Sequence, residues 1–501
     1  MTARPLCLFL LGAGFLCAEQ REPLEQWVKA HQQAVLREYN EMLSLTNIGS
    51  DKAGIAKNAE WLQKMLTRHG LTAEILPTDG NPLVYGEKRV PGATRTVLVY
   101  AHYDGQPLDA ARWKQASPFQ PVVRQGRLED GAKEVGDFLN LTAFPADWRI
   151  YARSASDDKA QIEAAISALD ALGSRLKNNV RVILDGEEEM GSPSLPAAIR
   201  KYADKLRADV MLVQDGPSHP SGRPTLYFGA RGSTSADLTV YGAKFSVHSG
   251  HYGNWVPNPI IQLAQLIATM KDGEGRAVVK DYYSDVPPLT PAQRKMLEAV
   301  PDDENALKKL FGIAEPDHVG KSYQESLQYP SLNLRNIDGG EQGGVIPTQA
   351  HAYLELRLVK ETKGEVLLAR IAEHIRKQGY HLVDGPPDDA TRAKYPKIAT
   401  LKARGGGSSS GGAWRTEADS AEGVRMISAL RTVWGQDPVV IRTVGGSVPA
   451  LPFMEILNVP AVALPIVNFD NNQHSDNENL RLGNLWNGIV SLAAAMQSGA
   501  N

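Results

Sequence analysis

The chain has 501 residues, which is too long for one ordinary hydrophobic core, so two or more domains are expected. Hydrophobic residues make up 42% of the chain and charged residues 22%, as in ordinary globular proteins, and the formal net charge is -3. This charge balance provides no basic field, so we expect no nucleic acid partner.

The first twenty residues have the pattern of a secretory signal. Arg4 precedes the apolar run Leu6–Leu16, and the small residue Ala18 follows it, so we predict a signal peptide over residues 1–18. The run is too short to remain as a membrane anchor, and no other segment is apolar for long enough, so the mature chain is expected to have no transmembrane segment. We therefore expect a secreted or periplasmic protein, with a lipid-anchored form at Cys17 as the alternative.

The cysteine count restricts the chemistry of the mature chain. The only two cysteines, Cys7 and Cys17, lie within the predicted signal. A chain without them has no disulfide, no thiolate metal ligand and no cysteine nucleophile. Any bound metal would therefore be held by histidine, aspartate and glutamate.

Helices are expected first, over residues 24–45 and 53–69, and apolar strands alternating with helices follow. The stretch "SDDKAQIEAAISALDALG" is expected to be a helix with Ser156 as its N-cap. Apolar strands separated by helices predict an α/β domain with a largely parallel sheet, covered by helices on both faces. The expected strands are "TVLVYAHYD", "VRVILDGEEE", "VMLVQDG" and "AVALPIVNFDNNQHSD".

The sequence pattern changes between about Gly229 and Arg404. Half-exposed strands such as "STSADLTVYG" and "AHAYLELRLV" accompany two helical stretches, which predicts a small α+β domain of the ferredoxin-like, split βαβ type. A polar, proline-bearing stretch at about 272–330 interrupts it, and "GGGSSSGG" at 405–412 has the composition of a flexible linker. The expected first domain therefore covers residues 19–228 and 405–501, and the inserted domain covers residues 229–404.

Acids and histidines follow the ends of the four expected strands of the first domain. They are His102 with Asp104, the triplet Glu187–Glu189, Asp215 and, after the last strand, His474. In open α/β sheets ligands bind at the carboxyl ends of the strands, and surface acids would not follow strand ends in this way. The pattern therefore predicts a site at this edge of the sheet.

The residue types in this set favour a metal site. Oxygen and imidazole ligands without sulfur suit zinc, manganese or cobalt. His102 and Asp104 would face the same side of an extended backbone, so the carboxylate could fix the imidazole tautomer. Asp157 could lie between two cations. If the backbone is extended at the glutamate triplet, Glu189 could bind metal while Glu188 points to a water molecule.

These residues lie in stretches that resemble a known family. The ordered set resembles the two-zinc metallopeptidases that include carnosinase, nonspecific dipeptidases, glutamate carboxypeptidases, aminoacylases and succinyl-diaminopimelate desuccinylase. "HYDGQP" and "HSGHYGN" are most similar to the carnosinase-like branch. The stretches are "YAHYDGQP", "SASDDKA", "DGEEEMGS", "VQDG", "VHSGHYGN" and "NQHSDNENL".

The resemblance implies a site for two metal ions. His102 and Asp215 would bind one zinc ion, Glu189 and His474 the other, and Asp157 would bridge them, followed by a cis peptide bond. Mn²⁺ or Co²⁺ could replace zinc.

The resemblance also implies roles for residues that bind no metal. Glu188 would be the general base on a metal-bridging water molecule, and Asp104 would orient His102. His248 would stabilise the oxyanion, often from the partner subunit of a homodimer formed through the inserted lid domain. Arg357 would bind a substrate carboxylate, and Gly446 and Ser447 would face the substrate.

The expected function is zinc-dependent hydrolysis of a peptide bond in dipeptides or small peptides with a free carboxylate. An N-acyl-amino-acid deacylase is the alternative, and a metal-containing binding protein without turnover is a third reading. The chain departs from the family at "YAR", Ala160 and Asp185, none of which removes an expected ligand. The polar insertion and the glycine-serine loop affect the expected specificity.

Overall fold

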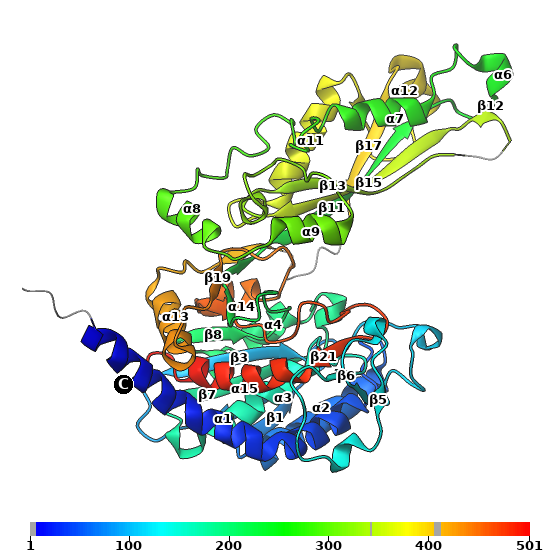
Figure 1. Ribbon diagram of the computed structural model, residues 1–501. Coiled ribbons are helices and arrows are strands. Elements are labelled where there is room, and N and C mark those ends of the chain that lie inside the picture. The colour runs from blue at the N-terminus through cyan, green and yellow to red at the C-terminus, as the bar shows by residue number, and fades with distance from the viewer. Residues whose placement is uncertain (1–6, 341–342, 405–411, 501) are drawn as a thin grey trace, which may run out of the picture.

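An eight-stranded mixed sheet forms the centre of the larger of two domains (Figure 1). The computed structural model describes residues 7–340, 343–404 and 412–500, with side chains from Gln20 onward. Four central strands, β7, β3, β8 and β20, run parallel, and antiparallel pairing occurs at β1, β2 and β9. In sheet order the strands are β1 (Thr72–Leu76), β2 (Leu83–Lys88), β7 (Asn179–Asp185), β3 (Thr96–His102), β8 (Val210–Val213), β20 (Ala461–Ala463), β9 (Thr225–Tyr227) and β19 (Val439–Ile441).

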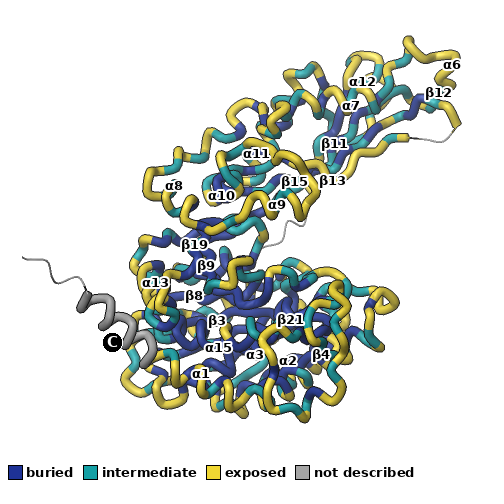
Figure 2. Tube along the Cα trace, in the orientation of Figure 1, coloured by how far each residue is buried: buried dark blue, intermediate teal, exposed yellow. Residues whose placement is uncertain are grey.

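Helices cover both faces of this sheet, as the sequence predicted. Along β3, Val97 and Val99 pack into one apolar cluster while Leu98 and Tyr100 pack into the other, so the strand is buried on both sides (Figure 2). The first face is covered by α1 (Cys7–Leu43), α2 (Lys52–Arg68), α3 (Lys159–Leu172), α13 (Ala421–Trp434) and α15 (Leu482–Met496). The second is covered by α4 (Leu195–Lys201), α5 (Ala203–Leu206) and α14 (Leu451–Leu457).

A four-stranded antiparallel sheet lies beside the large one and joins two distant segments. Its order is β21 (Asn479–Arg481), β6 (Arg149–Tyr151), β4 (Val122–Arg124) and β5 (Glu134–Val135). Asn479 pairs with Tyr151, so the loop that follows β6 and the loop that precedes β21 emerge side by side. These loops carry Asp157 and His474 respectively.

The smaller domain has the predicted ferredoxin-like arrangement. In sheet order its strands are β13 (Ser331–Asp338), β15 (Gln349–Leu358), β11 (Gly232–Tyr241), β17 (Ile398–Ala403) and β16 (His381–Leu382). Helices α7 (Pro259–Ala268) and α11 (Gly364–Lys377) pack on one face through leucines and isoleucines such as Leu263 and Ile371. Without the edge strand β16, the chain order is βαββαβ, which confirms the expected fold class.

The polar insertion lies between α7 and β13 and contacts the larger domain. Asp302 lies 3.1 Å from the imidazole of His219, and Arg442 donates to the side-chain oxygen of Gln328 at 2.8 Å. Its helices are α8 (Pro291–Glu298), α9 (Glu304–Phe311) and α10 (Tyr323–Ser326). The distal end of the smaller domain contains β12 (Val247–His248), α6 (Ser249–Tyr252) and α12 (Asp389–Lys394) (Figure 1), together with β14 (Val345–Ile346), which pairs with β12. Two short strands, β10 (Gly229–Ala230) and β18 (Trp414–Arg415), pair where the chain passes between the domains.

The N-terminal helix α1 begins at Cys7 and continues to Leu43, so it includes both the helix predicted from Leu24 and part of the predicted signal peptide. The signal peptide and its cleavage remain predictions. Most of the glycine-serine linker, at 405–411, lies outside the described residues. Within the described part of the chain, no helix combines the length and the apolar character needed to cross a membrane.

Candidate metal centre and active site

Two clusters of potential metal ligands lie at the carboxyl edge of the large sheet and share Asp157. One contains His102, Asp157 and Asp215, and the other contains Asp157, Glu189 and His474, with the ligand atoms of each cluster within 4.8 Å of one another. His102 Nε2 lies 2.9 Å from Asp157 Oδ1, and His474 Nε2 lies 3.0 Å from Asp157 Oδ2. Each carboxylate oxygen of Asp157 therefore faces a different cluster, which is the geometry of a bridging ligand.

The elements of the fold explain why these residues meet. His102 ends β3, and Asp215 follows the neighbouring parallel strand β8, so both lie at the same sheet edge. The Asp157 and His474 loops are brought together by the pairing of β6 with β21. The Asp157–Asp158 peptide bond is cis, as the family resemblance implied.

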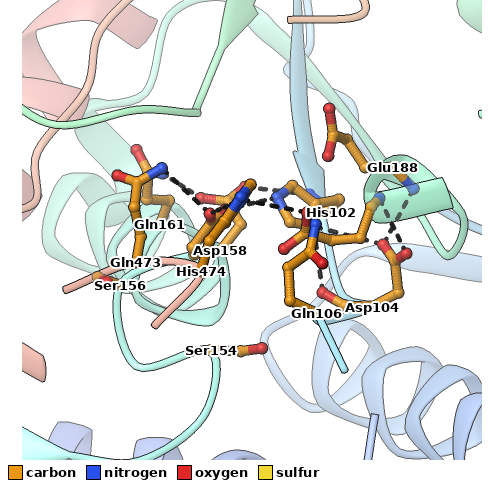
Figure 3. Close-up of polar contacts among 12 residues, drawn as sticks. His102, Asp104, Gln106, Ser154, Ser156, Asp158, Gln161, Glu188, Gln473 and His474 are labelled. Carbon is orange, nitrogen blue, oxygen red and sulfur yellow. Dashed lines mark hydrogen bonds and ion pairs between the residues drawn. The ribbon is translucent and has the colours of Figure 1, made fainter. Parts of the chain in front are cut away.

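Asp104 connects the two sides of the site. Its Oδ1 lies 3.4 Å from His102 Nδ1, and its two carboxylate oxygens accept the backbone N–H groups of Glu188 and Glu189 at 3.0 and 3.1 Å (Figure 3). The side chain is fully buried. Asp104 therefore lies where it can orient the imidazole, and it fixes the turn that carries the glutamates.

The backbone of the glutamate triplet is not extended, contrary to the sequence-based expectation. Residues Glu188–Met190 form a single 3₁₀ turn that begins three residues after the end of β7 and is closed by Gly191 in the left-handed region. Glu189 still faces the cluster, because its Oε2 lies 3.2 Å from His474 Nε2 and accepts from Gln106 at 2.6 Å. The turn, rather than strand alternation, separates the directions of Glu188 and Glu189.

Glu188 has the environment expected of a general base beside a metal site. Its carboxyl group has no hydrogen-bond partner among the described residues, and burial raises its pKa well above the usual value. Glu187, in contrast, is buried and structural. It accepts the backbone N–H of Asn81 at 2.7 Å and that of Ser194 at 3.2 Å.

The electrostatics of the clusters suit bound cations. Burial, together with the nearby charge of Asp157, raises the pKa of Asp215 to about 7, since several carboxylates share a small desolvated volume. Hydrogen bonds to Asp157 and Glu189 raise the pKa of His474 to about 10. Five nitrogen and oxygen donors, arranged in two overlapping sets without sulfur, match the ligand preferences of zinc and similar divalent ions.

Glu478 is a site residue that the sequence analysis missed. One carboxylate oxygen accepts from the backbone N–H groups of Ser156 and Asp157 and from the Ser156 hydroxyl, each at 2.9 Å. The other accepts from Ser154 N and from Arg153, also at 2.9 Å. Burial and the nearby charge of Asp157 raise the pKa of this carboxyl, and Arg153 opposes the rise, while each of its hydrogen-bond partners is a donor, as an ionised carboxylate requires.

Glu478 also explains why the predicted helix cap is wrong. Helix α3 begins at Lys159, and the Ser156 hydroxyl donates to Glu478 instead of capping the helix. The sequence signal was an acid four residues after His474 and close to apolar Leu480, which is fully buried. Such a residue needs buried donors.

The remaining predicted residues lie outside the two ligand clusters. Arg357 lies in β15 at the domain junction, where its Nη2 is 3.3 Å from Glu355 Oε1. Gly446 and Ser447 lie at the same junction, and the Ser447 hydroxyl donates to the backbone carbonyl of Arg231 at 2.8 Å. His248 is exposed in β12, at the end of the smaller domain that is farthest from β3 (Figure 1). The chain therefore does not bring its own His248 to its ligand clusters.

Comparisons with known proteins agree with this geometry. Residues 228–382 match the peptidase dimerisation domain of the M20 family. The chain is 27% identical over 424 residues to a Cys-Gly metallodipeptidase of Candida albicans, with 82% of this chain and 80% of the relative covered. It is 25% identical over 426 residues to the Beta-Ala-His dipeptidase of Homo sapiens, with 81% of this chain and 75% of the relative covered.

A solved structure supports the same relationship. The M20 family metallo-carboxypeptidase Sso-CP2 from Sulfolobus solfataricus superimposes with a TM-score of 0.73 at 28% sequence identity, covering 93% of this chain and 98% of that one. The chain therefore carries a match to the M20 peptidase dimerisation domain and is similar over most of its length to metallodipeptidases and to an M20 metallo-carboxypeptidase.

Proposed function

We propose that this protein is a metal-dependent dipeptidase that hydrolyses the peptide bond of small peptides with a free carboxylate. The single observation that carries this proposal is the pair of ligand clusters that share Asp157, with the unpaired carboxyl of Glu188 beside them. The names of the relatives in two dipeptidase groups support the same class of substrate.

The residues that would hold the ions follow from the two clusters. His102 and Asp215 would hold one ion, Glu189 and His474 the other, and Asp157 both. When bound, two divalent ions supply Lewis-acid chemistry, which activates water and polarises a carbonyl oxygen. We propose zinc, with manganese or cobalt as possible replacements, and elemental analysis of the purified protein tests this identity.

The protein side chains divide the remaining work. Glu188 takes a proton from the attacking water and delivers it to the leaving nitrogen, a role that its unpaired carboxyl beside the two clusters favours. Asp104 keeps the imidazole of His102 in one orientation and holds the Glu188 backbone in place. Arg357 binds the substrate carboxylate, since a planar guanidinium matches that group.

His248 acts on the site of a second subunit in this proposal. Its exposed position at the distal end of the smaller domain gives it no route to the metal clusters of its own chain (Figure 1). The matched dimerisation domain includes this residue and supports a homodimer. His248 would then donate a hydrogen bond to the developing oxyanion from the partner.

Parallel substrate panels test the proposed activity. We expect purified protein with added zinc or manganese to release amino acids from dipeptides, and to lose this activity with a chelator. A comparison with N-acetyl amino acids separates the deacylase alternative, since turnover of acylated amino acids alone would reject the dipeptidase assignment. Metal binding without any turnover would indicate the non-catalytic binding protein.

We also propose that the protein is secreted or periplasmic. The predicted signal over residues 1–18 supports this location, with a lipid-anchored form at Cys17 as the alternative. Sequencing the N-terminus of the protein exported by its natural host, or by a heterologous bacterial host, tests the cleavage. An N-terminus at Met1 in the cytoplasmic fraction alone would contradict it.

A further inference from the structure

Arg231 is a buried guanidinium without a carboxylate partner. The residue is 8% exposed, and its Nη2 donates to the Tyr329 carbonyl at 2.8 Å. Its Nε is also buried and has no hydrogen-bond acceptor among the described residues. Burying an unpaired charge is costly, so a folded chain that retains one usually has a use for it.

The other buried arginines show how unusual this environment is in the described part of the chain. They are Arg149, Arg153, Arg415 and Arg442. Each forms an ion pair with a carboxylate: Arg149 with Asp470, Arg153 with Glu478, and Arg415 and Arg442 with Glu417. Arg231 is the exception, which indicates that an anion from outside the described chain completes its environment.

Two backbone contacts fix Arg231 at the domain junction. Its N–H donates to the carbonyl of Val444 at 3.1 Å, and its own carbonyl accepts the Ser447 hydroxyl at 2.8 Å. The loop that the sequence predicted to face the substrate therefore holds Arg231. Because Ser447 donates its only hydroxyl proton to the Arg231 carbonyl, it has no proton left to donate to a substrate.

Arg231 lies next to the predicted carboxylate-binding residue. Ser233 pairs directly with Arg357 across β11 and β15, and Arg231 immediately precedes β11, two residues before Ser233, so Arg231 and Arg357 lie close together where β11 begins. Burial and the positive charge of Arg357 lower the pKa of Arg231 to about 10. Two adjacent guanidinium groups repel each other unless an anion lies between them.

Tyrosine side chains connect this pair to the metal clusters. Tyr323, in helix α10 of the insertion, interacts electrostatically with both Arg231 and Tyr227. Tyr227 interacts in turn with the cluster residue Asp215. Arg231 is therefore linked electrostatically to Asp215 through Tyr323 and Tyr227, and Tyr323 belongs to the insertion.

We propose that Arg231 binds the terminal carboxylate of the substrate together with Arg357, and that this second guanidinium makes the protein select substrates with a free carboxylate. The inference rests on the proposed dipeptidase function. A guanidinium with a free Nε can donate to one carboxylate oxygen while Arg357 donates to the other. The anion would then relieve the repulsion between the two arginines.

A comparison of a dipeptide with its C-terminal amide tests this role. We expect Arg231→Met to raise KM for the free dipeptide about 10- to 100-fold, because a charge-assisted hydrogen bond is lost. The kcat/KM for the amide should change less than about threefold, since the amide has no charge to lose. If the amide is not turned over, its inhibition constant against the free dipeptide replaces KM.

Two further variants separate binding from folding. Arg231→Lys keeps the positive charge and should recover part of the affinity for the free dipeptide. Arg404→Met removes another arginine of the same domain, one that is exposed and paired with Asp237, and should leave both substrates unaffected. Thermal unfolding and metal content of each variant show whether the fold is retained.

The outcomes distinguish this inference from the proposed function. If the wild-type protein hydrolyses no dipeptide, the proposed function fails. If it does, and Arg231→Met loses activity equally on acid and amide, or on neither, Arg231 does not read the carboxylate. A selective loss on the free acid, partly restored by lysine, supports the inference.

Discussion

Replacing Glu478 by glutamine tests how the fold positions the bridging ligand. The carboxylate accepts five hydrogen bonds, from the backbone N–H groups of Ser154, Ser156 and Asp157, from the Ser156 hydroxyl and from Arg153. In either orientation of the new amide, its NH₂ group would face buried donors. Leaving these donors unsatisfied beside an unpaired arginine should lower the free energy of unfolding by about 3–5 kcal/mol.

The assay is urea unfolding of the metal-free protein, followed by metal titration of the folded variant. We expect weaker metal binding as well, since the Asp157 loop loses its anchor. Glu163→Gln is the matched control. Glu163 is equally buried, and burial raises its pKa well above the usual value, so glutamine resembles its neutral form and should change stability little. Equal effects of the two substitutions, or unchanged metal affinity in Glu478→Gln, would refute the reasoning.

Two further predictions concern the dimer and the pH dependence of stability. Mixed dimers of inactive His248→Ala and inactive Glu188→Gln chains should regain about one quarter of wild-type activity, since half the dimers then contain one complete site; no recovery would exclude action across subunits. His69 lies 2.6 Å from Asp170 and 2.8 Å from Glu38, and these bonds raise its pKa to about 10. Because the pKa of His69 is higher in the folded than in the unfolded protein, its protonation stabilises the fold. This stabilisation is fully present below the unfolded-state pKa of about 6.5 and is lost as the pH rises through about 10. At pH 6 the wild type should therefore be about 1–2 kcal/mol more stable than His69→Gln, after allowance for the partial exposure of His69. This difference should disappear by about pH 10.5. A difference in the free energy of urea unfolding that stays constant with pH would contradict the assignment.

The sequence was sufficient for the strands, and it placed the candidate ligands at their ends, where the structure brings them together. Apolar runs such as the one before His102 predict buried parallel strands, and the carboxyl ends of such strands meet at one edge. The cis peptide after Asp157 and the order of the small domain also followed, the first from family resemblance and the second from half-exposed strand patterns.

Other features depended on contacts that no local pattern reports. The 3₁₀ turn at Glu188 is held by backbone bonds to Asp104, 84 residues earlier in the chain. Glu478 anchors the Asp157 loop from 321 residues away, so its buried donors were invisible in the sequence. Arg231 likewise stands out only in the structure, which shows that it is buried without a carboxylate partner among the described residues.

The most direct test of the central claim is dipeptide turnover by Glu188→Gln, measured with metal content on the same sample. The substitution removes the proposed base but none of the proposed ligands. We predict an unchanged metal content and a loss of about 10²-fold or more in kcat. Turnover equal to that of the wild-type protein, with metal bound, would contradict the account.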